Sequence, residues 1–170
     1  QSNDFNITPN AFQSTFISIS NSNSAQDAVV MKLNSDLSTL FWSTYLGGDN
    51  PDMGSGLRVD DFGAVYVTGF AGGSNFPMVS GGVQESWPGG QENGYIVKFT
   101  ADGSAITNGT FWGTTGDEHS YFIDIDEDDL VHIFGTTTGD MEITPNTYFF
   151  NEGSNQYLAG FPNDLSSVVY

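Results

Sequence analysis

The feature that most constrains the fold of this chain is a segment that recurs along it. Residues 27–48 read DAVVMKLNSDLSTLFWSTYLGG, and an altered copy, NGYIVKFTADGSAITNGTFW, follows at residues 93–112. A weaker third copy, NQYLAGFPNDLSSVVY, spans residues 155–170. Repeats of this kind stack side by side, because a single unit cannot bury its apolar face alone. The chain is therefore predicted to be a repeat array.

Each repeat is predicted to contain four short β-strands in two hairpins. Apolar, β-branched and aromatic runs alternate with turn residues, which is the pattern of hairpins, and no window shows the 3.6-residue period of a helix. A proline-bearing connector is expected between the second and third strands. The hairpin strands are predicted at residues 28–33 with 40–46, 57–60 with 64–68, and 121–126 with 130–134.

Four antiparallel strands per repeat are typical of a β-propeller blade, whereas a sandwich of about seven strands is the alternative within the all-β class. We expect a partial blade at residues 1–48, a blade at 57–113, and a blade truncated in its last strand at 121–170. Because a closed propeller needs at least about four blades, about 2.5 blades predict an incomplete propeller that is a fragment of a larger closed one. An open sheet array, or an assembly closed by several copies, is the alternative if the mature chain ends at residue 170.

The composition limits the partners of the chain. It has 21 acidic residues against 3 basic ones, and its formal net charge of −18 repels phosphate backbones and anionic lipids, so no nucleic-acid partner is expected. The absence of cysteine excludes disulfides and thiolate chemistry. No apolar run is long enough for a membrane span, so no membrane insertion is expected. Few basic residues and abundant Asn, Thr and Gly favour a secreted protein on the bacterial cell surface.

Three strings of the chain resemble the bacterial SBBP repeat, which is named for a seven-bladed β-propeller. They are the segment at residues 27–48, GLRVDDFGAVYVTGF at 56–70, and NFPMVSGGVQ at 75–84. Later copies depart from the pattern, since FWGTTGDE at residues 111–118 lacks the Tyr-Leu-Gly-Gly ending. The resemblance implies a large secreted or surface-anchored protein, often of Bacteroidota, beside adhesion-type domains and sorting domains for type IX secretion. It implies no catalytic residue and no cofactor.

The densest acidic cluster includes Asp124, Asp126 and Asp128. Spaced carboxylates suit Ca²⁺, which takes six to eight oxygen ligands, so these three residues are the candidate metal site. The alternative is a solvated hairpin turn, because the first copy has another acidic turn at the same place. The segment does not fit an EF-hand loop, since Asp129 replaces the required glycine.

Two lysines hold the same place in the first two copies. Lys32 and Lys98 are 66 residues apart and are two of the 3 basic residues. We expect each to have a structural role, pairing with a carboxylate that helps to define strand register. Asp27 or Asp60 is the expected partner of Lys32, and Asp126 that of Lys98.

The tryptophans divide into two groups. Trp42 and Trp112 align at a spacing of 70 residues, which differs from the spacing of 66 before the turn, and both are expected to pack blade on blade. Trp87 has no predicted equivalent and lies in a loop, where it is either the anchor of that loop or a contact for a sugar or protein ligand.

Two functions of different classes follow from these observations. The first is a non-catalytic propeller module of a secreted or surface protein, which binds a protein or glycan in adhesion, or acts as a structural spacer. Its expected partners include the rest of its own propeller and a secretion machinery that exports it as cargo. The alternative is the propeller part of a carbohydrate-active enzyme, although glycoside hydrolysis needs two carboxylates across the bond and no pair stands out.

Overall fold

The computed structural model describes residues 4–17, 26–145 and 155–170. Parts of the predicted first and third blades, namely residues 1–3, 18–25 and 146–154, lie outside this description. The described residues form nine strands and no helix, which confirms the all-β prediction. The strands are β1 (Ala28–Leu33), β2 (Leu40–Leu46), β3 (Met53–Val59), β4 (Val65–Ala71), β5 (Asn93–Phe99), β6 (Ile106–Trp112), β7 (Glu118–Ile125), β8 (Val131–Thr137) and β9 (Gln156–Phe161).

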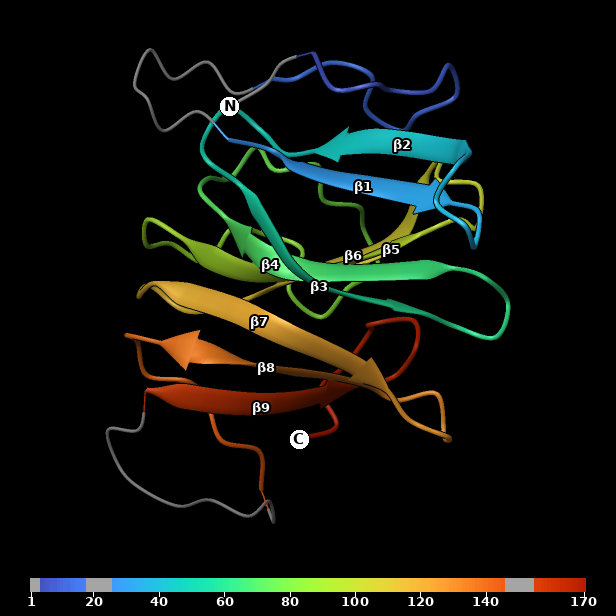
Figure 1. Ribbon diagram of the computed structural model, residues 1–170. Helices are drawn as coiled ribbons and strands as arrows, with labels where there is room; N and C mark the ends of the chain where they lie inside the picture. Colours follow the sequence, from blue (N-terminus) through green and yellow to red (C-terminus); the bar gives the residue numbers. More distant parts are fainter. Residues whose placement is uncertain (1–3, 18–25, 146–154) are drawn as a thin grey trace.

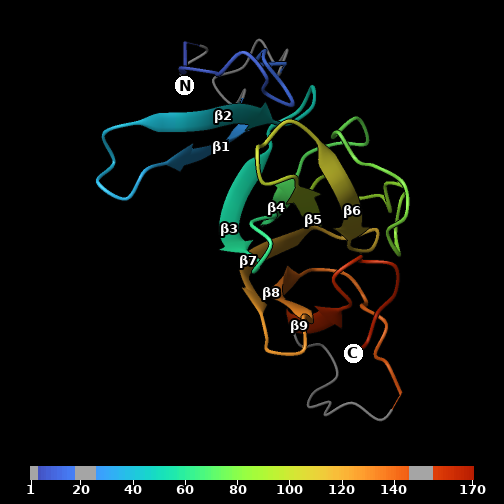
Figure 2. The ribbon, with the colours of Figure 1, turned by 90° about the vertical axis from the view of Figure 1, so that its right-hand side faces the viewer.

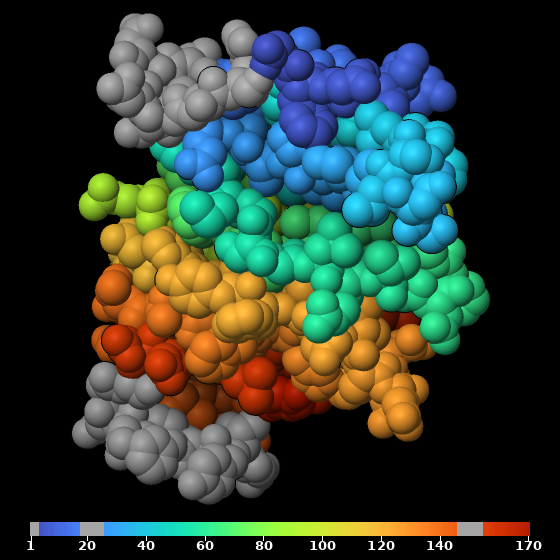
Figure 3. Space-filling model, in the orientation of Figure 1, coloured from blue at the N-terminus to red at the C-terminus, as the bar shows by residue number. Residues whose placement is uncertain are grey.

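The nine strands form three antiparallel sheets that stack as blades (Figures 1 and 3). The first blade contains β1 and β2, the second contains β3 to β6 in chain order, and the third contains β7 to β9. Strands β3 and β7 lie side by side at the inner edge of neighbouring blades, while β6 lies at the outer edge (Figure 2). The sheets do not close into a ring, in agreement with the predicted incomplete propeller. No helix with the length and apolarity of a membrane span occurs in the described part of the chain.

The predicted hairpins are present, and four of their strands are longer than the sequence indicated. Strand β7 begins at Glu118, whereas it was predicted to begin at residue 121, and β4 and β8 continue to Ala71 and Thr137 beyond their predicted ends at residues 68 and 134. Strand β3 begins at Met53, whereas the strand was predicted to begin at Leu57. The residues between them are Gly54, Ser55 and Gly56, which have low β-propensity but pair with β4 around an irregularity in register. Strand β4 then pairs with β5 across the long connector of residues 72–92.

The ladders correct the predicted alignment of the repeats. In the first hairpin Ala28 pairs with Leu46, and in the second Gly94 pairs with Trp112. Each residue of the second pair lies 66 positions after its counterpart in the first pair, so Trp112 is the counterpart of Leu46. The predicted spacing of 70 after the turn, which aligned Trp42 with Trp112, is wrong. A shift of four residues keeps every side chain on the same face of its strand, so the alternation of the sequence could not detect the error.

Two apolar clusters lie at the seams between the blades. At the first seam one face of the first blade packs on the second blade, and at the second seam the other face of the second blade packs on the third. The first cluster is Ala28, Val30, Trp42, Leu46, Val65, Val67, Ala71, Phe76, Tyr95, Val97, Phe99, Ile106 and Phe111. The second is Tyr66, Ile96, Ile123, Val131, Ile133, Tyr157, Ala159, Phe161 and Leu165.

A tryptophan of one blade meets a phenylalanine of the next at both seams. The rings of Trp42 and Phe99 have centroids 6.5 Å apart, and those of Trp112 and Phe161 lie edge to face at 5.1 Å. The two phenylalanines are counterparts, since each pairs with the first valine of its neighbouring strand. The Nε1–H of Trp42 also donates a hydrogen bond of 3.0 Å to the carbonyl of Ala101. Both tryptophans therefore lie between blades although they occupy different strand positions.

We predict that Phe99→Ala lowers the free energy of unfolding by about 3–5 kcal/mol, because a fully buried ring at the first seam leaves a cavity. Urea denaturation measures the change. The control is Phe62→Ala, since Phe62 is 87% exposed and its loss should change stability by less than about 0.5 kcal/mol. Equal stability of both variants would contradict the assignment of the seam as the main core.

Candidate functional site

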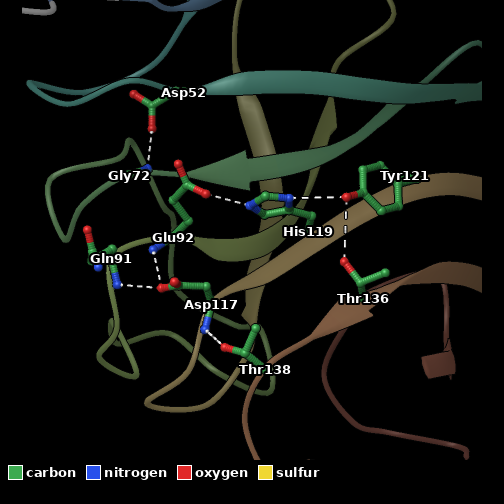
Figure 4. A network of polar contacts seen from close by, with 9 residues as sticks. All are labelled: Asp52, Gly72, Gln91, Glu92, Asp117, His119, Tyr121, Thr136 and Thr138. Carbon is green, nitrogen blue, oxygen red and sulfur yellow. Dashed lines mark hydrogen bonds and ion pairs between the residues drawn. The ribbon is translucent and has the colours of Figure 1, made fainter. Parts of the chain in front are cut away.

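A polar cluster at the seam between the second and third blades is the most distinctive site of the described surface (Figure 4). The Nε2 atom of His119, on β7, lies 2.5 Å from Oε2 of Glu92, the residue before β5. The Nδ1 atom of His119 lies 3.2 Å from the hydroxyl of Tyr121, which accepts a hydrogen bond of 3.5 Å from Thr136 on β8. Phe70 of β4 stacks on the imidazole with a centroid separation of 4.4 Å. The cluster therefore joins both blades through one histidine.

The chemistry of this cluster follows from its donors and acceptors. A carboxylate only accepts hydrogen bonds, so Nε2 of His119 donates to Glu92, and in the neutral imidazole Nδ1 accepts from the phenol of Tyr121. A histidine oriented by a carboxylate and bonded to a hydroxyl is an arrangement seen in nucleophilic catalysis. It is also a strong charge-assisted link between two blades.

The motifs and spacings of the sequence did not predict this cluster. Moving back by the 66-residue period, His119 corresponds to Met53 and Glu92 to Gln26, so the earlier copy lacks both ionisable groups. Departure from the repeat was the signal that could have identified them. This departure did not indicate that His119 and Glu92 contact each other, because the two residues are 27 positions apart and meet across a seam.

Two buried carboxylates close equivalent loops, one after β2 and one after β6. Asp52 is 1% exposed and accepts backbone hydrogen bonds from Gly48 at 2.6 Å and Gly72 at 3.0 Å. Its counterpart Glu118 is fully buried and accepts from both the backbone N–H and the hydroxyl of Thr114. Burial raises the pKa of Asp52 to about 7, and the nearby charge of Asp27 adds to the effect.

Glycine is required between these carboxylates and a neighbouring side chain. A Cβ atom on Gly47 would lie 2.7 Å from Cγ of Asp27 and 2.9 Å from Oδ2 of Asp52. On Gly113 it would lie 2.1 Å from Oδ1 of Asn93. Asn93 is the counterpart of Asp27, so the second copy has an amide where the first has a carboxylate. The first copy therefore holds a like-charge pair that the second avoids.

We predict that Asp52 makes stability depend on pH. Its folded pKa of about 7 exceeds the ordinary value of 3.8, so its contribution is fully present below pH 3.8 and is lost as the pH rises through about 7. Thermal melts of Asp52→Asn across this range should show a flatter profile than the wild type, and Asp27→Asn should lower the pH-dependent loss by a smaller amount. Asp61→Asn, on an exposed turn, is the charge-matched control. A wild-type profile that rises over this range would contradict the assignment.

The structure pairs Lys98 with a carboxylate of its own blade. Its Nζ atom lies 3.4 Å from Oδ2 of Asp60 and 4.8 Å from the ring centroid of Tyr66. Burial lowers the pKa of Lys98, but Tyr66 and Asp60 outweigh this effect and raise it overall. The predicted partner Asp126 is wrong for Lys98, since Asp126 bonds to His132 instead. Lys32 is exposed, and no ion pair to Asp27 or Asp60 is found for it among the described residues.

The different outcomes for the two lysines have a structural reason. Lys98 on β5 lies beside Tyr66 on β4, and Asp60 follows β3, so both neighbours come from inner strands of the same blade. The first blade has only β1 and β2 among its described strands. Among the described residues, no strand beside β1 holds counterparts of Tyr66 and Asp60 next to Lys32.

We predict that Lys98→Met lowers stability by about 1–3 kcal/mol, because the Asp60 carboxylate, only 7% exposed, loses its cation. Lys32→Met removes the same charge at an exposed site and should leave the urea midpoint unchanged. Unchanged stability of Lys98→Met would show that the ion pair makes no net contribution.

In the third blade, a histidine and a tyrosine replace the lysine arrangement. Gly160 stands at the position of Lys98, and a Cβ atom on it would lie 2.7 Å from the ring of Tyr170. Tyr170 stacks on His132 and hydrogen-bonds its Nδ1 atom, while Nε2 lies 2.7 Å from Asp126. The same place in successive blades is thus filled by different side chains.

The predicted metal ligands do not converge. Asp124 forms an ion pair of 2.8 Å with Arg58 of β3, and the hydrogen bond from Arg58 lowers the pKa of Asp124. Asp126 accepts backbone hydrogen bonds from Asp128 and Leu130, as expected for a hairpin turn. No group of three or more His, Cys, Asp or Glu residues within the described ranges is arranged to hold a metal ion. Calcium binding stays a prediction without a ligand set.

Trp87 packs against the blade edge. Its ring meets Phe111 edge to face at 5.4 Å, and Phe16 meets Tyr45 in a similar way at 5.8 Å. Tyr45 and Phe111 are counterparts, so Phe16 is the equivalent of Trp87, and the prediction that Trp87 has no equivalent is wrong. Trp87 is half-buried in this position.

Equivalent glutamines attach the connectors to the outer strands. The backbone N–H of Gln13 donates to Oγ1 of Thr44 at 2.9 Å, and that of Gln84 donates to Oγ1 of Thr110 at 3.0 Å. The Oε1 atom of each glutamine also accepts a hydrogen bond from the backbone N–H of the glycine that follows the outer strand, which is Gly47 for Gln13 and Gly113 for Gln84. These bonds hold the connector beside the blade. They thereby position the aromatic residue that follows each glutamine by three positions, Phe16 or Trp87.

Comparison with known families agrees with this architecture. Residues 42–77 match the SBBP family, described as a beta-propeller repeat. The match runs from β2 through β3 and β4 into the connector. The chain therefore contains an SBBP β-propeller repeat. No curated protein matches the chain.

Proposed function

We propose that this chain is a non-catalytic β-propeller module that presents a rigid surface for adhesion or acts as a structural spacer. The observation that carries the proposal is the use of ionisable groups as links within and between blades. His119 bonds to Glu92 across the second seam, Lys98 pairs with Asp60, and Arg58 pairs with Asp124 of the next inner strand. Such links favour a fixed arrangement of blades over a reactive site.

The proposed location is the outside of a bacterial cell. The absence of cysteine and the net charge of −18 support a stable, highly charged surface protein. The SBBP repeat supports a secreted or surface-anchored origin in Bacteroidota, with export as type IX cargo. A protein or glycan on a neighbouring surface is the proposed ligand class for the adhesive role.

One observation favours the alternative function. Glu92, His119 and Tyr121 form a relay in which a phenol could act as nucleophile, and the exposed fraction of Tyr121 is 37%. A propeller part of a carbohydrate-active enzyme would use such a group at its reacting centre. The relay makes Tyr121 the residue to test.

We predict that incubation with a panel of polysaccharides releases no new reducing ends, and that Tyr121→Phe gives the same result as the wild type. Binding of the same panel, measured by retention on immobilised glycans, separates adhesion from a spacer role. Hydrolysis by the wild type that Tyr121→Phe abolishes would reject the non-catalytic proposal and support the alternative.

A further inference from the structure

A bulge in β7 brings the side chain of Tyr121 beside His119. The register of β7 with β8 passes from Ser120 directly to Phe122, so Tyr121 is the extra residue of the irregularity. A bulge of this kind re-aims the side chain that it contains, and such bulges are common beside active sites. Here the phenol of Tyr121 lies 3.2 Å from Nδ1 of His119, which is two residues earlier on the same strand (Figure 4).

The position of Tyr121 is accessible even in a blade that has neighbours on both sides. Its counterpart in the second blade is Ser55, which is the extra residue of the same irregularity in β3. Ser55 is exposed although the first and third blades pack on the two faces of the second. Tyr121 is 37% exposed and is the only exposed tyrosine of the described residues. Its accessibility therefore belongs to the inner edge of a blade and not to an uncovered blade face.

His119 is arranged to take the proton of this phenol. Its Nε2 atom donates to Oε2 of Glu92 at 2.5 Å, which leaves Nδ1 of the neutral imidazole as an acceptor that faces the phenol. Phe70 holds the imidazole by stacking on it. The hydroxyl of Thr136 donates to the phenolic oxygen at 3.5 Å, so that oxygen keeps a donor when its proton leaves. A hydroxyl beside a base that a third group orients is the arrangement that activates a weak nucleophile.

The charges around the cluster favour an uncharged electrophile. A phosphoryl donor would bring negative charge beside Glu92 in a chain whose net charge is −18, and both Arg58 and Lys98 are engaged in ion pairs with other carboxylates. A glycosyl donor needs a second carboxyl group to protonate its leaving oxygen, whereas Glu92 is engaged by His119. An uncharged carboxylic ester needs neither a cation nor a second acid, because the imidazolium of His119 supplies the proton for its leaving group.

We propose that Tyr121 is a covalent acceptor site, whose phenol takes an acyl group from a small uncharged ester. The phenolic oxygen attacks the carbonyl carbon of the ester, and its proton passes to Nδ1 of His119. The tetrahedral intermediate then expels the alcohol oxygen, which takes this proton from His119, so the products are a tyrosyl ester and a free alcohol. The acceptor site goes beyond the adhesive or spacer role and does not depend on it, because a single modification of each chain requires no turnover.

The other histidine of the third blade has partners of the same kinds. His132 bonds to Asp126 through Nε2 and to the hydroxyl of Tyr170 through Nδ1. Burial raises the pKa of Tyr170, and the charge of Asp126 adds to this effect. Both influences disfavour the phenolate of Tyr170, so this residue is not the expected acceptor. His132 therefore provides a matched control for His119.

The test is incubation of the chain with p-nitrophenyl acetate, an uncharged ester, followed by peptide mass spectrometry over time. The wild type should become acetylated at Tyr121. His119→Gln retains a side chain that can hydrogen-bond to Glu92 but lacks a base, so it should lower the rate of Tyr121 acetylation by at least about tenfold. His132→Gln, the matched control, should leave that rate unchanged.

A second variant and an internal marker guard against loss of the fold. Glu92→Gln removes the carboxylate that stabilises the imidazolium, and it should also slow acetylation of Tyr121. Tyr66 and Tyr95 are buried, so their acetylation in any variant would reveal unfolding, which melting curves measure independently. Equal rates at Tyr121 in the wild type and in folded His119→Gln and Glu92→Gln would show that exposure alone governs the reaction. That result, or a wild type without an acetyl group on Tyr121, would overturn the proposal.

Discussion

Packing of one sheet face on the next is the interaction on which the rest of this structure depends. A blade of four short strands has two faces, and its strands alternate side chains between them. The second blade buries Val97 toward the first blade and Ile96, the adjacent residue, toward the third. Neither face could be buried within the blade itself. Stability is therefore a property of neighbouring blades together, as in other repeat proteins.

Polar groups extend this arrangement to the seams and the loops. Backbone N–H groups of glycine-rich loops satisfy Asp52, and hydroxyl and backbone donors satisfy Glu118, so two acids are buried at equivalent places. Burial of a carboxylate without such donors would be costly. At the second seam, the contact between His119 and Glu92 adds a polar link beside the apolar cluster. Both copies of the repeat thus have an acidic residue that closes the equivalent loop, whereas their residues at the seams differ.

Features that depend on residues close together in the sequence were predicted correctly, whereas contacts between distant residues were not. Hairpins were predictable because their turns and alternating runs are local, and the lower propensity of Gly54 and Gly56 explains why β3 was predicted too short. Alignment of Trp42 with Trp112 failed because a shift of four residues preserves the face of each side chain. The partner of Lys98 and the contact between His119 and Glu92 could not be found by local pattern, since each joins residues from different hairpins.

By itself, the sequence determined the all-β class, the repeat, the strand alternation and the excess of acidic charge, because these follow from residue type and short-range order. Only the tertiary structure decided which faces are covered. Phe122 and Phe134 belong to strands as regular as their buried counterparts, yet their exposure depends on whether another sheet packs on them. The tertiary structure also decided that Asp60 pairs with Lys98 and that Asp52 is buried with a raised pKa. Burial and pairing are relations between distant segments, and the order of residues along one strand does not specify them.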